Sequence, residues 1–211
     1  MKHLLDILSR ALSVVFYPLF VPTYGILLFC IGLKMQTGIL PAIYWWVAIG
    51  GTFIFTCFIP LTLILYMLRK RQIRSLDMTD PKERKMPYLY TLGGYVFWAY
   101  FVSAVLEGPS WMIATSIGAT VVLAIVALIN GFWKISAHSA GIGGLTGGVC
   151  AYSLYYSVMP TALILTMFGL SLLLMYARLY ANAHSSHQVV AGYLLGIIGT
   201  FIPAFLTSLY A

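Results

Sequence analysis

The stretch WMIATSIGATVVLAIVALINGF, residues 111–132, contains no charged side chain. A helix needs about 20 mostly apolar residues to cross the hydrocarbon core of a bilayer. Backbone groups in lipid must form hydrogen bonds within their own segment, so helix is the default conformation there. Segment 111–132 therefore predicts a membrane-spanning helix.

Six further apolar segments flank this one, at residues 11–33, 42–68, 88–106, 142–158, 160–177 and 189–210. The 211-residue chain is 61% hydrophobic and 8% charged, with a mean hydropathy of +0.94, which excludes an ordinary soluble domain. We expect an all-α integral membrane bundle with six or seven spanning segments. Residues 1–211 would form a single domain, with N-terminal spans in 1–68 and a core in 69–211.

Prolines and glycines indicate how these segments are shaped. Segment 11–33 contains Pro18 and Pro22, so we expect it to be kinked or re-entrant. Small residues four apart let helices approach closely. Such pairs occur twice in 142–158 and once in 189–210: Gly143 with Gly147, Gly144 with Gly148, and Gly192 with Gly196. A phosphate-cradling loop is the alternative interpretation of these glycines.

Three polar islands interrupt the apolar pattern, at residues 69–87, 133–140 and 178–188. Two apolar segments separate the first island from the second, and two more separate the second from the third. An even number of crossings returns the chain to the same side of the membrane. All three islands should therefore meet on one membrane face.

The first island is strongly basic. Asp80 is a good N-cap, Pro81 suits a first helical turn and Glu83 completes a capping box, so a helix should begin at Pro81. A basic loop that only sets the orientation of the chain is the alternative. The helix would place three cations beside the membrane: Lys82, Arg84 and Lys85.

The second island ends just before a glycine-rich segment. Ser136 can cap the helix that follows and can also donate to a phosphate, toward which the next backbone N–H groups would point. His138 could give a proton to a leaving oxygen. A capping serine beside an interfacial histidine is the alternative.

The third island contains Arg178 and His184 between two long apolar segments. A guanidinium can grip a phosphoryl group at two points, and a histidine can attack or protonate it. If a helix starts near Asn182, Gln188 lies on the same face as His184 and could orient its ring. His187, three residues from His184, is a possible decoy.

These residues resemble the motifs of the type 2 phosphatidic acid phosphatases. Ser136-Ala137-His138 is similar to the middle motif, Pro-Ser-Gly-His. Arg178, five residues and His184 are similar to the third motif, which is Ser-Arg, five residues, His, three residues, Asp. The stretch from Lys82 to Pro87 resembles a degenerate first motif, which is Lys, six residues, Arg-Pro. The resemblance covers about residues 70–205.

The resemblance implies a six-helix membrane bundle, whose core is shared with vanadium haloperoxidases. It also implies hydrolysis of phosphomonoesters and pyrophosphates without a metal. His184 would be the nucleophile that forms a phosphohistidine, and His138 would be the acid for the leaving group. The groups that hold the phosphoryl oxygens would be Arg178, Ser136, the N–H of Ala137, and one or two of Lys82, Arg84 and Lys85.

The motifs also differ from the family pattern. Gln188 stands where the family has the Asp that orients the nucleophile, Ala177 replaces a Ser, and Ile135 and Ala137 replace Pro and Gly. An amide can orient a ring but stabilises an imidazolium less than a carboxylate does. A catalytically silent lipid-phosphate binding or transport protein is therefore an alternative function, and a structural membrane subunit is another.

We expect a lipid phosphatase acting on a phosphomonoester or diphosphate such as undecaprenyl diphosphate, phosphatidylglycerol phosphate or phosphatidic acid. The net charge is +7, and the basic residues cluster between apolar segments. This distribution favours lipid phosphate over nucleic acid as the partner. No cluster of carboxylates or cysteines suits an ion, so we expect no metal or other cofactor. Cys30, Cys57 and Cys150 fit packing roles.

The distribution of charge and the resemblance disagree about sidedness. By the expected spans, all of the twelve Lys and Arg except Lys34 lie on the face of the islands. The positive-inside rule then places that face toward the cytoplasm of a bacterial inner membrane. Many members of the resembled family work on the outer face instead.

Overall fold

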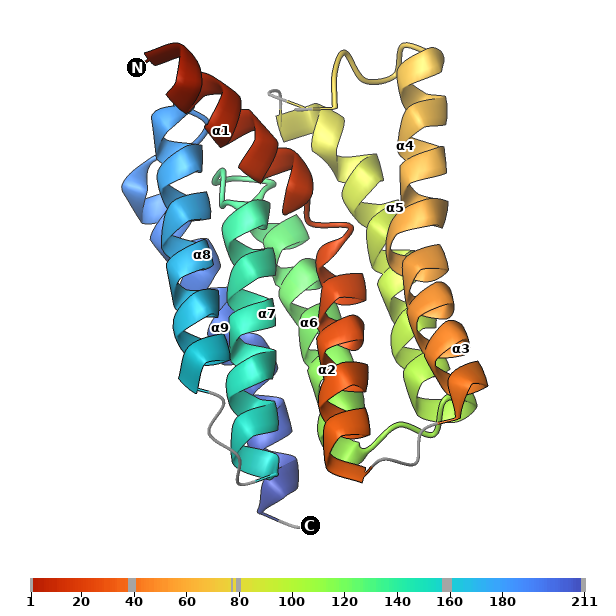
Figure 1. Ribbon diagram of the computed structural model, residues 1–211. Coiled ribbons are helices and arrows are strands. Elements are labelled where there is room, and N and C mark those ends of the chain that lie inside the picture. The colour runs from red at the N-terminus through yellow and green to blue at the C-terminus, as the bar shows by residue number, and fades with distance from the viewer. Residues whose placement is uncertain (1, 38–40, 77, 79–80, 157–160, 210–211) are drawn as a thin grey trace.

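The computed structural model describes residues 2–37, 41–76, 78, 81–156 and 161–209, and all regular structure in these ranges is helical (Figure 1). The elements are α1 (Lys2–Val15), α2 (Val21–Thr37), α3 (Ala42–Phe53), the π-helical turn η1 (Ile54–Phe58), α4 (Ile59–Arg69), α5 (Pro81–Tyr100), the π-helical turn η2 (Phe101–Val105), α6 (Ser110–Ile129), α7 (Ala137–Tyr155), α8 (Thr161–Tyr180) and α9 (Ser186–Ser208). Because η1 joins α3 to α4 and η2 extends α5, the described residues form eight helices.

Four helices of the described chain are long and apolar enough to cross a membrane: Ala42–Arg69, Ser110–Ile129, Thr161–Tyr180 and Ser186–Thr207. They support an integral membrane protein, but the expectation of six or seven such spans is wrong. Three of the expected segments fall short for different reasons. The apolar part of α2, Val21–Gly32, is short. Helix α5 begins with charged residues, and α7 contains five glycines, which lower its hydropathy.

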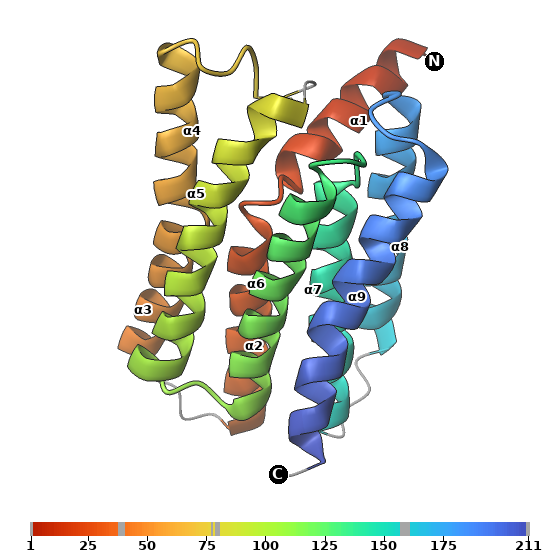
Figure 2. The same cartoon turned by 180° about the vertical axis from the view of Figure 1, so that it is seen from behind.

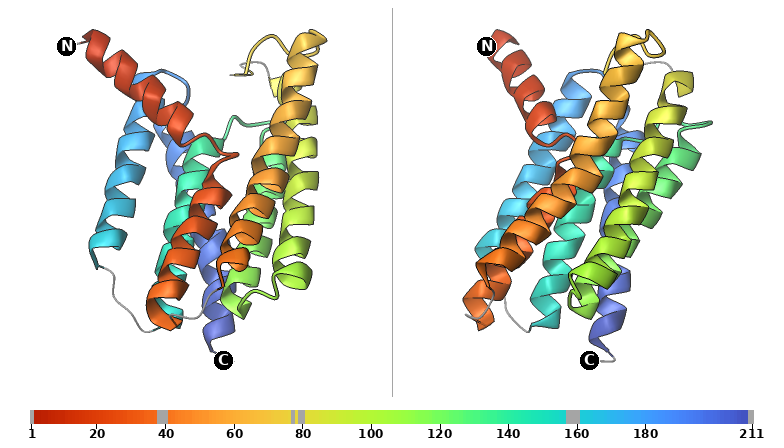
Figure 3. Two further views of the ribbon diagram at one scale, coloured as in Figure 1. Left: turned by 45° about the vertical axis from the view of Figure 1, so that its right-hand side comes forward. Right: turned by 90° about the vertical axis from the view of Figure 1, so that its right-hand side faces the viewer.

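The first apolar segment is broken, as its prolines predicted. Helix α1 ends at Val15, and turns around Pro18 lead into α2 at Val21. Helix α1 lies obliquely across one end of the bundle, whereas α2 runs along it (Figures 1 and 3). Helix α1 packs against α8 at this end.

The three polar islands lie at one end of the bundle. The α4–α5, α6–α7 and α8–α9 connections are at the end that carries α1 and the N-terminus, and the views from front and back agree (Figures 1 and 2). The islands therefore meet at one end of the bundle, as the parity of the segments predicted. This meeting follows from the antiparallel succession of helices.

Helix α7 is the centre of the bundle and contacts α2, α6, α8 and α9. Its closest neighbour is α9, because glycines remove the side chains that would hold the two backbones apart. A Cβ on Gly196 would overlap the carbonyl oxygen of Ala140, and a Cβ on Gly192 would crowd that of Ser136. Close packing as the role of these glycines is confirmed, and it sets the second island directly against the third.

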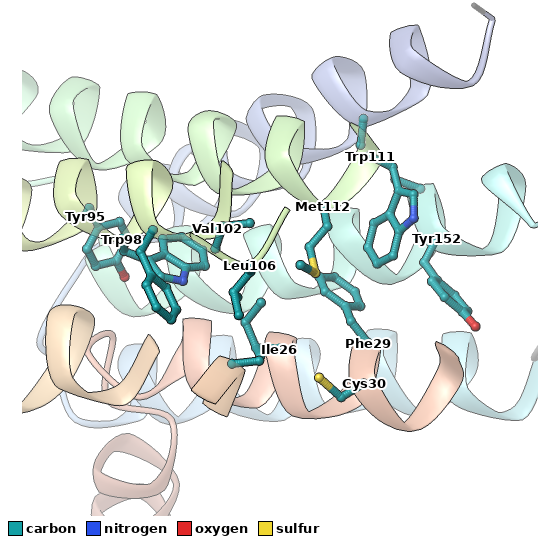
Figure 4. Close-up of a cluster of buried hydrophobic side chains, with 14 residues drawn as sticks. Ile26, Phe29, Cys30, Tyr95, Trp98, Val102, Leu106, Trp111, Met112 and Tyr152 are labelled. Atoms are coloured by element: carbon teal, nitrogen blue, oxygen red, sulfur yellow. The ribbon is translucent and has the colours of Figure 1, made fainter. Parts of the chain in front are cut away.

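The deep core is aromatic and lies among α2, α5, α6 and α7 (Figure 4). The rings of Phe29 and Trp111 meet edge to face with centroids 4.7 Å apart. The Trp98 indole donates to Thr52 Oγ1 at 3.0 Å, so its polar atom is satisfied. The three cysteines carry no disulfide, and Cys30 and Cys57 are buried among apolar neighbours, in agreement with packing roles.

Candidate functional site

A cavity of about 200 Å³ runs from the polar end of the bundle into the aromatic core. Residues from all three islands line its polar end: Arg84, His138, Arg178 and His184. Apolar side chains of α2, α5 and α6 line the rest, including Phe29, Trp98 and Met112. No Asp or Glu occurs among the described residues of this lining. The cavity is therefore cationic at one end and apolar along its length.

The third island forms a tight turn between α8 and α9. Asn182 adopts a left-handed conformation with φ of 50°, which Asn tolerates better than most residues, and the N–H of Ala183 donates to the Arg178 carbonyl at 3.1 Å. Helix α9 begins only at Ser186, so the expected helix start near Asn182 is wrong. His184 is a loop residue held between two helix ends.

The ring of His184 is fixed by a backbone carbonyl from the second island. Its Nδ1 lies 3.2 Å from the carbonyl oxygen of Lys134. A carbonyl oxygen can only accept, so Nδ1 carries the proton and Nε2 of the neutral ring keeps its lone pair. This tautomer leaves Nε2 available as a nucleophile.

The surroundings of His184 keep this ring neutral. Burial, together with the nearby charges of Arg178 and Lys134, lowers its pKa from 6.5 to about 4, although hydrogen bonds to Lys134 and Gln188 act in the opposite direction. The ring is therefore uncharged at neutral pH.

Gln188 has a structural task in addition to its contact with His184. Its Oε1 accepts from the backbone N–H of Ser185 at 3.1 Å, as part of a capping box at the start of α9. Its side chain also hydrogen-bonds to His184, which raises the pKa of the ring. The expected orienting role is thus shared, and the Lys134 carbonyl is the acceptor at Nδ1.

The second island forms the N-terminus of α7. Ser136 is the N-cap and accepts from the N–H of Ser139 at 3.3 Å, which confirms its capping role. Ser136 is fully buried and, unlike Ala137 and His138, does not line the cavity. Its proposed contact with phosphate therefore gains no support from its position.

Helix α1 brings one residue to both His138 and Arg178. His138 Nε2 donates to the carbonyl oxygen of Ser13 at 3.1 Å, and Arg178 Nη1 donates to Ser13 Oγ at 3.1 Å. The Ser13 hydroxyl donates in turn to the Ser9 carbonyl at 2.8 Å. Sequence reasoning missed Ser13. The signal was present in two serines four residues apart on an amphipathic segment.

Arg84 is the described cation of the first island that enters the cavity. It is buried, its Nε donates to the Met78 carbonyl at 2.6 Å, and its Nη1 donates to Asn130 Oδ1 at 2.9 Å. Lys85 is exposed and lies outside the lining. The side chain of Lys82 lies outside the described residues.

The start of α5 at Pro81 is as expected, whereas Asp80, its expected N-cap, lies outside the described residues. Glu83 was expected to complete a capping box at this helix. That box would involve Asp80 and so lies outside the described residues. The Glu83 carboxylate meets Arg74, at 3.5 Å from Arg74 Nε. Glu83 therefore ties the basic loop before α5 to the helix.

The polar end of the cavity concentrates positive charge. Burial lowers the pKa of Lys134, and the nearby Arg84 and Arg178 guanidinium groups lower it further. Mutual repulsion of cations in a partly desolvated place is costly unless an anion compensates it. The arrangement therefore suits a phosphate. His187 is exposed on α9 and does not line the cavity.

Within the described ranges, no three His, Cys, Asp or Glu side chains are grouped closely enough to hold a metal ion. Comparisons with protein families, with curated proteins and with solved structures found no match to this chain.

Proposed function

We propose that this protein is an integral-membrane lipid phosphatase that cleaves a phosphomonoester or diphosphate from a lipid. The observation that carries the proposal is the meeting of Arg84, His138, Arg178 and His184 at the cationic end of an otherwise apolar cavity. Arginines suit bidentate binding of phosphate oxygens, and two histidines can serve as nucleophile and acid.

The geometry supports a two-step reaction through His184. Nε2, which holds the free lone pair, attacks phosphorus while the bond to the lipid oxygen breaks. Burial lowers the pKa of His138 to about 3, so the ring gains its proton only when the bound phosphate anion offsets the nearby cations. His138 then gives this proton to the leaving oxygen. Arg178 and Arg84 hold the phosphoryl oxygens, and the Lys134 carbonyl stabilises the charged ring of the phosphohistidine. Water then hydrolyses this intermediate and releases phosphate.

The length of the cavity favours a lipid substrate. Its lining follows α6 from Val126 to Met112, a distance of about 21 Å at 1.5 Å per helical residue. That is roughly two-thirds of the ~30 Å hydrocarbon core of a bilayer. A hydrocarbon chain attached to the phosphate can therefore be buried within the bundle.

The basic residues favour a site on the cytoplasmic face of a bacterial inner membrane. The islands gather at the end of the bundle that carries α1, and the net charge of +7 is concentrated in them. Cytoplasmic loops are enriched in Lys and Arg. This sidedness is part of the proposal.

A catalytically silent lipid-phosphate binding or transport protein is the second candidate. Two observations favour it. Gln188 replaces a carboxylate and is used partly as a helix cap, and Ser13 engages both His138 and Arg178. Such a protein would bind lipid phosphate without releasing inorganic phosphate.

Release of inorganic phosphate separates the two candidates. Purified full-length protein in detergent micelles is incubated in EDTA with undecaprenyl diphosphate, phosphatidylglycerol phosphate or phosphatidic acid. We expect multiple turnovers on at least one lipid, undiminished by chelator and inhibited by orthovanadate, which can adopt the pentacoordinate geometry of phosphoryl transfer. Binding of these lipids without turnover would favour the second candidate. Activity lost in EDTA and restored by magnesium or zinc would contradict the proposed mechanism.

A further inference from the structure

Asn130 is a buried polar residue at the end of an apolar helix. It follows α6, which contains no charged residue, and its side chain is 4% exposed. A buried amide without partners costs free energy, so its hydrogen bonds show what fixes it. Asn130 itself lies outside the three polar islands.

The amide of Asn130 has a defined orientation. Its partner Arg84 Nη1, at 2.9 Å, can only donate, so the atom that faces it must be Oδ1. Its Nδ2 donates to the Val126 carbonyl at 3.0 Å and to the hydroxyl of Tyr88 at 3.3 Å. The Nδ2 bonds therefore fix the Asn130 amide, and its Oδ1 in turn fixes Arg84.

Arg84 is consequently fixed at two points. Nη1 is bound to Asn130, and Nε is bound to the Met78 carbonyl at 2.6 Å. Two bonds to different atoms set the plane of a guanidinium, which is planar. Arg84 and Tyr88 line the cavity, whereas Asn130 lies behind them and does not.

We propose that Asn130 is a positioning residue that, with Tyr88, aims the Arg84 guanidinium at an anion in the cavity. The inference rests on the proposed function for the identity of that anion, a phosphoryl group. Asn130 acts through Arg84 and touches no substrate. A neutral amide suits this task, because a carboxylate in its place would neutralise Arg84.

The test measures equilibrium binding of orthovanadate to the full-length protein, together with the thermal midpoint of each variant. Asn130→Leu removes the acceptor, and we expect about ten-fold weaker vanadate binding, since hydrogen bonds to charged groups are worth about that factor or more. In turnover assays KM should rise more than kcat falls, because Arg84 holds the phosphoryl group in the ground state as well.

Two further variants keep the test decisive if Asn130→Leu folds poorly. Asn130→Asp keeps an oxygen toward Arg84 but loses the Nδ2 bond to the Val126 carbonyl. It should therefore fold with a somewhat lower thermal midpoint and still weaken vanadate binding through charge neutralisation. Tyr88→Phe removes the hydroxyl that accepts from Asn130 and should cause a smaller, few-fold loss of vanadate affinity.

Ser153→Ala is the matched control. It removes a buried polar side chain that likewise bonds to a helix carbonyl four residues back, away from the cavity lining, and vanadate binding should not change.

Three results would overturn the inference. They are wild-type vanadate affinity in Asn130→Leu and Asn130→Asp, affinity losses that follow the thermal midpoint in every variant including Ser153→Ala, and a wild-type protein that binds no vanadate. Vanadate binding needs no turnover. Asn130-dependent binding without lipid hydrolysis would therefore contradict the phosphatase proposal alone, and lipid hydrolysis with unaffected Asn130 variants would contradict this inference alone.

Discussion

The ring of His184 is held in one tautomer and lies near two cationic side chains. The Lys134 carbonyl holds the proton on Nδ1, and burial with Arg178 and Lys134 opposes a second proton on the ring. A histidine on a protein surface would be partly protonated near pH 6.5 and would then lose its lone pair. The environment thus widens the pH range in which the ring stays neutral and can act as the proposed nucleophile.

This environment predicts where activity falls in acid. The pKa of His184 is lowered to about 4, so the neutral ring persists as the pH falls through 6.5 and is lost near pH 4. The logarithm of kcat/KM, which reports the free enzyme, should show the acid limb of this group near pH 4. The measurement is kcat/KM on one lipid phosphate from pH 3.5 to 8. An acid limb at pH 6.5 would show that His184 titrates as an exposed histidine.

Gln188 should matter less for catalysis than its motif position suggests. Gln188→Leu removes a hydrogen bond to His184 and half of a capping box, but the Lys134 carbonyl remains on Nδ1. We expect a loss of about 1 kcal/mol in stability from the cap, and a rate reduction of about ten-fold rather than several orders of magnitude. Initial rates and thermal midpoints measured at equal folded concentration check this. A rate below one-thousandth of wild type would mean that Gln188, and not the carbonyl, orients the ring.

The sequence identified charged and histidine side chains at the candidate site, but not the backbone carbonyl that orients His184. Arg178, His138 and His184 stand out because charges and imidazoles are rare at membrane boundaries. The Lys134 carbonyl leaves no signal in a sequence, since every residue has one. Ser13 and Asn130 are uncharged and lie outside the motifs, so only the folded chain reveals their partners.

At the scale of elements, the contact between α7 and α9 holds the site together. It brings Ser136 and the second island against Gln188 and the third, and the Ser136 N–H donates to the Gln188 carbonyl at 3.2 Å. Glycines make this approach possible, because an added Cβ would meet a carbonyl oxygen of the neighbouring helix.

Gly196→Ala should therefore be destabilising. The new Cβ would overlap the Ala140 carbonyl oxygen, so the helix backbones must separate, at a cost of about 1–3 kcal/mol. Gly169→Ala in α8 is the control, since a Cβ there meets nothing within 4 Å and alanine favours helix by up to about 1 kcal/mol. Thermal midpoints in one detergent compare the two. Equal midpoints for both variants would show that the α7–α9 contact is looser than described.

The sequence predicted the existence of helices better than their boundaries. The break at Pro18 and the start of α5 at Pro81 follow from proline stereochemistry, which is local. The start of α9 at Ser186 was not predicted, because the left-handed Asn182 and the capping box compete with a continuous helical pattern across residues 182–188. The number of long apolar spans was overestimated, because apolar runs did not distinguish α7, a glycine-rich helix packed among other helices, from helices suited to lipid.

At the scale of the molecule, alternating helix directions gather three distant islands at one end of the bundle (Figure 2). The parity of the connections made this predictable without any knowledge of side-chain contacts. The depth of the cavity was not predictable, because it depends on how aromatic side chains of α2, α5 and α6 leave space beside α7. The resulting molecule has a cationic mouth and an apolar interior.

The most direct test of a phosphatase that works through His184 is phosphate release by two histidine variants. His184 lines the cavity and His187, three residues later, is exposed outside it. Each variant is purified, its fold is checked by its thermal midpoint, and initial rates are measured on the best lipid substrate in EDTA. We predict that His184→Ala lowers the rate at least a thousand-fold, of the order lost on removing a nucleophile, while His187→Ala stays within a few-fold of wild type. Wild-type turnover by folded His184→Ala would contradict the account.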